Sequence, residues 1–282
     1  MHDTALTGVP RGGTTLACRL LGEAVDSVAL FEPMPVDELP LPADAACDAV
    51  LDYFRGVRAR IRRERRAPSR LHAGQVPDNP YTDRGPNTGR AWRVEPGEMV
   101  VAKPLTEHFH LLIKHNAAFM ALLPLLTRRM PVLGVLRNPL AVLCSWHSVD
   151  LPVSHGRLPA GERLDPVLAQ RLAAIPDVPT RQLLIIDWCF ERLLRWLPPE
   201  RLLRYEDIVA DGGTSLLAAA GLVGVPADLR NRNASPQCER DQVARQAEAL
   251  LRHGGPGVDA YGSASIEALA TAILNGADNG ER

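Results

Sequence analysis

The sequence predicts a single α/β domain in which helices flank a mainly parallel sheet. Short apolar runs alternate with helical segments along the chain, and this alternation is typical of parallel sheets. A glycine-rich loop connects the first apolar run to the first helical segment. Several later apolar runs end in a charged residue, and parallel sheets bind ligands at the carboxyl ends of their strands. The pattern therefore predicts the fold class and also the edge of the sheet where a ligand binds.

The composition argues against several classes of protein. The 282 residues include 46% hydrophobic side chains and carry a net charge of −1, so nothing indicates a nucleic-acid partner. Every long apolar run is broken by Lys, Arg or Pro before it reaches membrane-spanning length, and no signal peptide precedes the first predicted strand. The five cysteines are scattered without a CxxC pair, which indicates reduced thiols in a cytoplasmic protein.

The first predicted elements are a strand over residues 4–7 and a helix, joined by the loop Gly8-Val9-Pro10-Arg11-Gly12-Gly13-Thr14-Thr15. The glycine spacing matches a Walker A loop, in which backbone N–H groups at a helix N-terminus surround a phosphate. Thr14 occupies the position of the Walker lysine, which argues against a nucleoside triphosphate as ligand. We expect a phosphate held by backbone amides, Arg11 and the two threonine hydroxyls. The alternative is a tight turn that needs its glycines for backbone conformation alone.

The next segment is an expected insertion over residues 45–98. A strand over 28–31 ends at Glu32 before it, and a helix from about 44 to 66 opens it. Seven arginines crowd the end of this helix, either as a solvated face or as a binding surface for an anionic acceptor, at positions 55, 58, 60, 62, 63, 65 and 66. Residues 67–98 are dense in Pro, Gly, Asn and Asp and predict a long irregular loop, with the role of a lid or acceptor-binding region.

Strands and helices alternate again up to a frayed polar tail at residues 276–282. Strands are expected at 99–102, 111–113, 131–136 and 201–205, and helices at 117–129, 139–149, 165–175, 180–197, 239–252 and 263–275. A loop rich in Pro and Gly is expected over 151–161. Residues 183–187 have an alternative assignment as a Walker B strand, although the apolar residues after them recur at helical spacing.

Polar side chains near the predicted strand ends form a second candidate site beside the glycine loop. Lys114 follows the strand 111–113, and Arg137 follows the strand 131–136. Ser145 lies about two helical turns after Arg137. An arginine and a hydroxyl in these positions are suited to hold a second phosphate. Two phosphate sites without a Walker lysine indicate a nucleotide that is phosphorylated at two separate positions.

Four motifs together resemble the sulfotransferases that use 3′-phosphoadenosine-5′-phosphosulfate (PAPS): the glycine loop, Lys114, Arg137 with Ser145, and Arg204-Tyr205-Glu206-Asp207. The resemblance covers residues 4 to about 210 and is nearest to the tyrosylprotein and carbohydrate sulfotransferases. It implies a P-loop-kinase-like α/β fold and transfer of the sulfo group of PAPS to a hydroxyl of a glycan, glycolipid or secondary metabolite. It further implies that residues 11–15 bind the 5′-phosphosulfate, that Arg137 and Ser145 bind the 3′-phosphate, and that Tyr205 lies near the nucleotide.

The resemblance also implies three catalytic residues. Glu32 lies 21 residues after Arg11, in the position of the glutamate base of the tyrosylprotein branch, and apolar neighbours that exclude water would raise its pKa. Lys114 would contact the bridging oxygen and the sulfo group, and Arg11 would share that task. Each has a structural alternative: Glu32 and the arginines as partners in ion pairs, Lys114 as an exposed strand-end residue. Ser145 has an alternative as a helix serine bonded to its own backbone, and Tyr205 as a core ring.

The chain departs from the family pattern at two positions. Gly12 replaces the usual serine of the loop, and His115 follows Lys114 directly, so no histidine is assigned as the base. His108 and His110 lack a carboxylate or cysteine to complete a metal site, and no metal is expected. Two other functions stay open: a P-loop kinase or nucleotide hydrolase with a degenerate Walker A, and a nucleotide-binding protein without catalysis.

Overall fold

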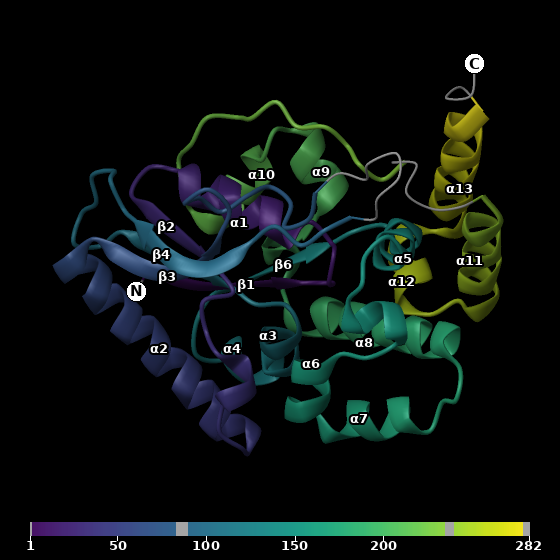
Figure 1. Ribbon diagram of the computed structural model, residues 1–282, viewed down its shortest axis with the longest axis horizontal. Helices are drawn as coiled ribbons and strands as arrows, with labels where there is room; N and C mark the ends of the chain where they lie inside the picture. Colours follow the sequence, from purple (N-terminus) through teal and green to yellow (C-terminus); the bar gives the residue numbers. More distant parts are fainter. Residues whose placement is uncertain (1, 83–89, 235–239, 279–282) are drawn as a thin grey trace.

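The computed structural model (Figure 1) describes residues 2–82, 90–234 and 240–278. Its main sheet has five strands in the order β2-β5-β1-β6-β7. They are β1 (Asp3–Gly8), β2 (Ser27–Phe31), β5 (His110–Lys114), β6 (Val132–Leu136) and β7 (Leu202–Arg204). Every pair of neighbours is parallel, so the predicted α/β class with a parallel sheet is confirmed.

Helices cover both faces of the sheet because successive strand residues point to opposite sides. Ala5 belongs to one hydrophobic core and Leu6 to the other. The first core packs under α2 (Ala43–Glu64), α4 (Leu123–Leu126), α5 (Pro139–His147) and α8 (Val178–Trp196). The second packs under α1 (Thr14–Glu23), α9 (Tyr205–Ala210) and α10 (Thr214–Ala220), which lie above the sheet in Figure 1. This two-sided burial explains why the strands read as continuous apolar runs.

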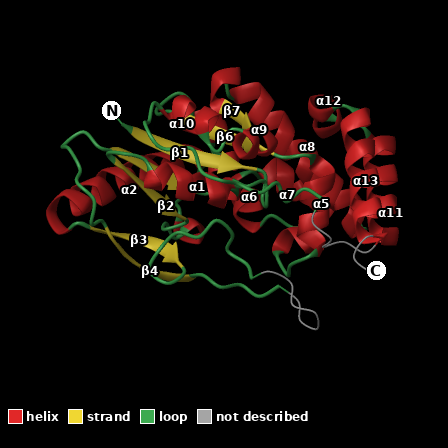
Figure 2. Cartoon of the chain, turned by 90° about the horizontal axis from the view of Figure 1, so that it is seen from above, coloured by secondary structure: helices red, strands yellow, loops and turns green. Residues whose placement is uncertain are grey.

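The remaining helices extend the first side of the domain. They are α3 (Ala117–Ala121), α6 (Pro159–Leu164), α7 (Pro166–Ala173), α11 (Arg240–His253), α12 (Pro256–Tyr261) and α13 (Ser263–Asp278), with single 3₁₀ turns η1 (Val36–Glu38), η2 (Pro152–His155) and η3 (Pro199–Arg201). Figure 2 shows α11 and α13 beside α5, at the end of the molecule away from α2. In the described part of the chain, no helix is long and apolar enough to cross a membrane.

The expectation of an irregular loop over residues 67–98 is wrong at both of its ends. β3 (Arg66–Leu71) and β4 (Glu95–Val100) form a separate two-stranded antiparallel sheet. Ser69 joins it to the main sheet, because its hydroxyl accepts a hydrogen bond from the backbone N–H of Phe31 at 3.0 Å. The strand expected at 99–102 is the end of β4, which begins four residues earlier than predicted.

Several further assignments need correction, although the helix expected over 180–197 is confirmed as α8. The single helix expected over 117–129 is two short ones, α3 and α4, with Pro124 in the first turn of α4. Proline is tolerated in a first turn but cannot continue a helix, which explains the break. Residues 183–187 lie inside α8, so the alternative of a Walker B strand is wrong. The loop expected over 151–161 contains η2 and the start of α6, and α13 extends to Asp278, so only residues 279–282 of the predicted tail lie outside the described residues.

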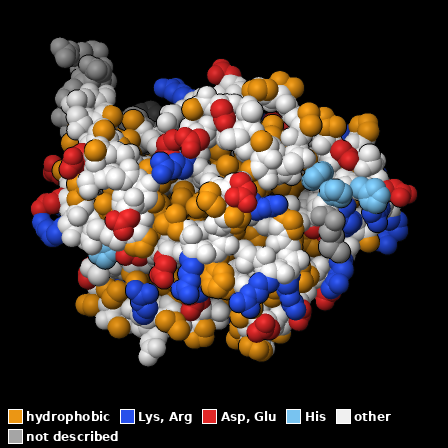
Figure 3. Space-filling view, turned by 180° about the vertical axis from the view of Figure 1, so that it is seen from behind, with side chains coloured by type: hydrophobic (Ala, Val, Ile, Leu, Met, Phe, Trp, Pro, Cys, Tyr) orange, Lys and Arg blue, Asp and Glu red, His pale blue; other side chains and the backbone are white. Residues whose placement is uncertain are grey.

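The arginines of α2 have partners within the chain. Arg58 donates to Asp3 and to the backbone carbonyl of Phe109, and Arg60 pairs with Glu98 at 2.7 Å. Arg55 and Arg63 pair with carboxylates of α2 itself. Figure 3 shows Lys and Arg side chains interspersed with Asp and Glu on one face of the molecule. These ion pairs favour the interpretation of the arginines as a charged, solvated helix face over their interpretation as a binding surface for an anionic acceptor.

Candidate functional site

A cavity of about 560 Å³ opens at the carboxyl ends of the strands. Nine of the ten residues singled out from the sequence line it: Arg11, Gly13, Thr14, Thr15, Glu32, Lys114, Arg137, Ser145 and Tyr205. Gly12 lies behind them and donates its N–H to the carbonyl of Val9 at 2.8 Å. The cavity volume is in the usual range for a small-molecule site, roughly 300–1,000 Å³. Residues from five separate segments thus converge on one cavity.

The backbone of the glycine loop is left-handed at two positions, a conformation that glycine adopts easily and most other residues do not. Arg11 has φ 66° and Gly13 has φ 94°, both in the left-handed region. A Cβ atom on Gly13 would lie 2.5 Å from Cδ2 of Tyr205, so a side chain there would displace the ring. No side chain caps the N-terminus of α1. The first N–H groups of this ten-residue helix are therefore available to an anion in the cavity.

The two threonines at the start of α1 are buried, and one is held in place by a residue that the sequence did not single out. Thr14 Oγ1 donates to Asn116 Oδ1 at 3.0 Å. Asn116 is the second residue after β5, and its carbonyl accepts a hydrogen bond from Thr7 Oγ1 at 3.0 Å. The end of β5 thereby fixes the position of the glycine loop. Asn116 lines the cavity beside Thr14 and Thr15.

Arg137 lies against the glycine loop. Its Nη1 donates to the backbone carbonyl of Arg11 at 3.0 Å, and its guanidinium carbon lies 4.5 Å from the centre of the Tyr205 ring. Its Nε donates to Asn233 Oδ1 at 2.8 Å, and Asn233 Nδ2 donates to Glu206 at 2.6 Å. The side chain is 8% exposed. Glu206, which belongs to the motif Arg204-Tyr205-Glu206-Asp207, and Asn233, which the sequence did not single out, therefore hold this arginine at the cavity wall.

Ser145 lies beside Arg11, whereas the sequence led us to pair it with Arg137. Its Oγ accepts a hydrogen bond from Arg11 Nε at 3.1 Å. Burial and the neighbouring cations Arg90 and Arg137 lower the pKa of Arg11 to about 9. Like charges this close repel one another unless an anion lies between them. Arg11, Arg90 and Arg137 therefore form one cationic cluster, whereas the sequence led us to expect two separate phosphate sites.

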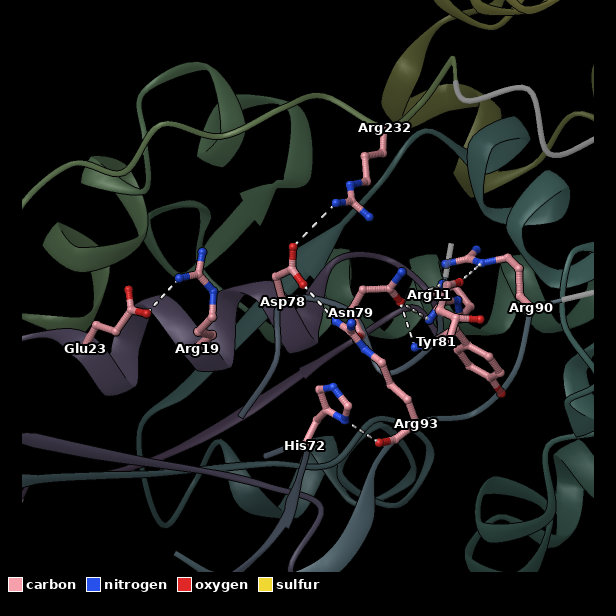
Figure 4. Close-up of polar contacts among 11 residues, drawn as sticks. Arg11, Arg19, Glu23, His72, Asp78, Asn79, Tyr81, Arg90, Arg93 and Arg232 are labelled. Carbon is pink, nitrogen blue, oxygen red and sulfur yellow. Dashed lines mark hydrogen bonds and ion pairs between the residues drawn. The ribbon is translucent and has the colours of Figure 1, made fainter. Parts of the chain in front are cut away.

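The segments on either side of residues 83–89 cross over this cluster (Figure 4). Asn79 Oδ1 accepts hydrogen bonds from both Nη atoms of Arg11 at 3.3 Å, and the Arg11 guanidinium lies 4.9 Å from the centre of the Tyr81 ring. Asp78 pairs with Arg93 at 3.3 Å and with Arg232 at 3.5 Å. Figure 4 shows Arg232 and Asp78 reaching toward each other from separate segments of the chain. This part of the expected lid region therefore contacts the glycine loop itself.

Glu32 and Lys114 form an ion pair inside the cavity. Lys114 Nζ donates to Glu32 Oε1 at 2.5 Å, and it lies 4.6 Å from the centre of the Phe31 ring. Lys114 is 3% exposed, whereas the Glu32 side chain is 29% exposed and reaches the cavity. Adjacent parallel pairing of β2 with β5 brings the two together, because Phe31 lies opposite Lys114. Glu32 has φ 45°, an uncommon conformation that turns the chain directly after the strand.

The expectation of a raised pKa for Glu32 is wrong. Burial alone would raise it, but the charge of Lys114 and its hydrogen bond outweigh burial, and the pKa of Glu32 lies below its ordinary value. His115 is buried next to this pair, and burial lowers its pKa to about 3. The neutral ring accepts a hydrogen bond at Nε2 from the backbone N–H of Met34 at 3.2 Å. His115 therefore acts as a structural acceptor.

The histidines of the strand edge form no metal site among the described residues. The rings of His2 and His110 are tilted at 57° with 4.7 Å between their centres, and the ring centre of His108 lies 6.2 Å from that of His2. No group of three or more His, Cys, Asp or Glu side chains in the described ranges is arranged to hold a metal ion. The four cysteines among these residues are free and buried.

Comparison of the chain with known protein families, with curated proteins and with solved structures found no match. The geometry of the cavity and the motifs of the sequence therefore carry the functional assignment.

Proposed function

We propose that this chain is a PAPS-dependent sulfotransferase that acts on a hydroxyl group. The observation that carries the proposal is that one cavity holds both a cationic cluster at a glycine loop and a carboxylate–ammonium pair. The cluster suits an anion with several phosphate oxygens. The pair suits a reaction in which a hydroxyl loses its proton while charge develops on a neighbouring anion.

The donor would lie along the cationic cluster. Its 5′-phosphosulfate would accept hydrogen bonds from the N–H groups at the start of α1, from Thr14 and Thr15 and from Arg11. Its 3′-phosphate would lie near Arg137, whose buried guanidinium is already oriented by Asn233. The Tyr205 ring, packed on Gly13, would lie close to the nucleotide. The glycine loop in this role, and the parallel sheet behind it, support a P-loop-kinase-like fold.

Glu32 and Lys114 would carry the chemistry. The acceptor oxygen attacks the sulfur atom, its proton moves to the Glu32 carboxylate, and the bond between sulfur and the bridging phosphate oxygen breaks. Adenosine 3′,5′-bisphosphate leaves with the electron pair of that bond. Lys114, now paired with Glu32, would turn to the bridging oxygen and stabilise its developing charge. Arg11 would contribute to the same stabilisation from the other side of the loop.

The segments that cross the cluster would act as a lid within the proposed insertion over residues 45–98. Asn79 and Tyr81 contact Arg11, and Asp78 bridges Arg93 and Arg232. A donor phosphate would replace Asp78 as the partner of Arg232, since a dianion attracts a guanidinium more strongly than one carboxylate does.

A P-loop kinase or nucleotide hydrolase with a degenerate Walker A is the alternative. Thr14 in place of the Walker lysine and the helical state of residues 183–187 weigh against it. Calorimetry separates the two functions. We expect adenosine 3′,5′-bisphosphate to bind with the same affinity with and without Mg²⁺, and ADP and ATP to bind more weakly. Preferential binding of ATP that requires Mg²⁺ would contradict the sulfotransferase assignment.

A further inference from the structure

The cavity has an apolar end next to Glu32. We call the cavity-lining residues of segments 31–37, 114–118 and 151–160 the acceptor end. Outside the Glu32–Lys114 pair, its side chains are mostly hydrophobic: Phe31, Val36, Ala117, Leu151, Leu158 and Ala160. Apolar surface of this kind binds an apolar ligand by removing both surfaces from water.

Few polar groups of the acceptor end are open to a ligand. His115 Nε2 accepts a hydrogen bond from the N–H of Met34, and Asn116 Oδ1 accepts one from Thr14. Lys114 is paired with Glu32. An acceptor with many hydroxyls, such as a sugar, would lose bonds to water without gaining enough partners here.

The charge of the acceptor end is not suited to an anionic acceptor. The charged side chains in its three segments that line the cavity are Glu32, Asp37 and Lys114, and the lysine is neutralised by its partner. An acidic peptide or an anionic glycan would meet the carboxylate of Asp37, a Glu32–Lys114 pair without net charge and no unpaired cation within these segments.

The walls of the acceptor end are fixed by hydrogen bonds outside the cavity. Arg163 of α6 donates to the carbonyl of Leu39, which ties α6 to the segment after η1. Gln182, 2% exposed on α8, donates to the carbonyls of Val153 and Ser154 at 3.0 and 3.2 Å and so anchors η2. Because α3 also packs against α6, the end has a defined shape before any ligand binds.

Glu32, the proposed base at the acceptor end, is a weak base. The charge and hydrogen bond of Lys114 overcome the effect of burial and hold the pKa of Glu32 below its ordinary value. A weak base removes a proton more readily from a phenol, whose pKa is about 10, than from an aliphatic alcohol, whose hydroxyl has a much higher pKa, close to that of water. The Phe31 ring, which is almost fully buried, packs against Lys114 at the cavity wall and makes the surroundings of the reacting group apolar.

From these observations we infer that the acceptor is a neutral phenol whose hydroxyl is carried on an apolar ring system, held between α3, α6 and the two turns η1 and η2. This inference rests on the proposed sulfotransferase function and narrows its acceptor. In the reaction the phenolic oxygen forms the new bond to sulfur, Glu32 receives the phenolic proton, and adenosine 3′,5′-bisphosphate carries away the electrons of the broken sulfur–oxygen bond.

The test compares four acceptors with PAPS and the full chain. 2-Naphthol is the probe, decahydro-2-naphthol has a similar size without the acidic hydroxyl, and N-acetylglucosamine and an acidic tyrosine peptide represent polar acceptors. We expect kcat/KM for 2-naphthol to exceed that of decahydro-2-naphthol at least about tenfold and those of the polar acceptors about a hundredfold. Equal use of decahydro-2-naphthol, or preference for a polar acceptor, would overturn the inference.

Two variants test the walls. Val36→Asp should raise KM for 2-naphthol about tenfold or more and leave the affinity for adenosine 3′,5′-bisphosphate unchanged, because it adds a charge to an apolar surface. Val167→Asp on α7, where the side chain is 64% exposed outside the cavity, is the matched control and should change neither value. Ala160→Leu, which only narrows the cavity, should slow 2-naphthol more than phenol itself.

Binding of the bisphosphate is measured in parallel and separates two failures. If the bisphosphate binds and a polar acceptor is preferred, the acceptor class is wrong and the sulfotransferase function stands. If the bisphosphate does not bind, the proposed function is wrong and the inference falls with it.

Discussion

The guanidinium of Arg137 donates from Nη1 to the backbone carbonyl of Arg11 at 3.0 Å, which connects the end of β6 to the glycine loop. Its Nη2 also donates to the backbone carbonyl of Arg232 at 3.0 Å, and the side chain lines the cavity, so one residue both positions the loop and lies within reach of a bound anion. These two roles of Arg137 can be separated by experiment, because the position of the loop affects the stability of the protein and contact with an anion affects ligand affinity.

Arg137→Ala should weaken binding of adenosine 3′,5′-bisphosphate about 100-fold, or about 2.7 kcal/mol, since charge-assisted hydrogen bonds to a phosphate are lost. Calorimetry measures the change. Arg204→Ala is the matched control: Arg204 also donates to a backbone carbonyl, at 2.8 Å, and stacks on a tyrosine at 4.8 Å, but it does not line the cavity. If the two variants lose the same affinity, Arg137 has no direct part in binding.

Glu32→Gln should lower kcat about 10²- to 10⁴-fold, because the amide cannot accept the acceptor proton. Binding of the bisphosphate should stay within about twofold, since the amide oxygen can still accept a hydrogen bond from Lys114. Glu98→Gln, which breaks the half-exposed pair with Arg60, controls for a general effect of losing a carboxylate. Full activity in the Glu32 variant would assign the base to another residue.

Gly13→Ala should destabilise the protein by about 2–3 kcal/mol and also weaken bisphosphate binding, as measured by urea unfolding and calorimetry. The new methyl group would lie 2.5 Å from the Tyr205 ring in a residue with φ 94°. Gly221→Ala is the control, with φ 67° but nothing within 4 Å of the added atom, and it should cost about 1 kcal/mol from backbone strain alone. Equal costs would mean that the contact with Tyr205 does not matter.

His115 should make the protein less stable in acid. Burial lowers its pKa to about 3, whereas the unfolded chain binds the same proton near pH 6.5, so between these values the unfolded state binds more protons. Stability therefore falls as the pH drops below 6.5, by about 2 kcal/mol at pH 5.

His115→Gln replaces the imidazole, which can bind a proton, with an amide that cannot. The amide oxygen can still accept a hydrogen bond from the N–H of Met34. The gap in unfolding free energy between this variant and the original chain should shrink by about 2 kcal/mol from pH 7 to pH 5. A constant gap for His115→Gln would show that the buried imidazole is already protonated at pH 5.

The sequence was sufficient to predict the parallel sheet and most of the cavity. Strands buried on both faces are apolar throughout, and the residue after each strand lies at the same edge, so Glu32 and Lys114 could be placed there without a structure. Their ion pair then follows from the adjacent parallel pairing of β2 and β5.

The small sheet of β3 and β4 was missed for a physical reason. β3 contains Pro68 and β4 contains Pro96 and Gly97, residues that are unfavourable in strands. Only one side of β3 is buried, through the small residues Ala67 and Ser69 together with Leu71, so hydrophobic alternation is weak. Tertiary contact with β2 rather than local preference maintains this sheet.

The supporting residues of the site could not be predicted at all. Asn79, Asn233 and Asn116 are single polar residues in connecting segments, and nothing in the neighbouring sequence distinguishes them from ordinary turn residues. Their roles depend on partners between 27 and 109 positions away. The pairing of Ser145 with Arg11 rather than with Arg137 has the same origin, because spacing along one helix does not determine which distant side chain lies opposite.

The central strand of the sheet has a consequence for synthesis of the chain on the ribosome. β1 pairs with residues 111–114 on one side and with residues 132–135 on the other, and the loop after it is anchored by the N–H of Val9 on the carbonyl of Val135. The nascent N-terminal third therefore leaves the ribosome with both edges of β1 unpaired. The glycine loop takes its final shape only after β6 has emerged, so truncated translation products would lack a complete cavity and would be prone to aggregate.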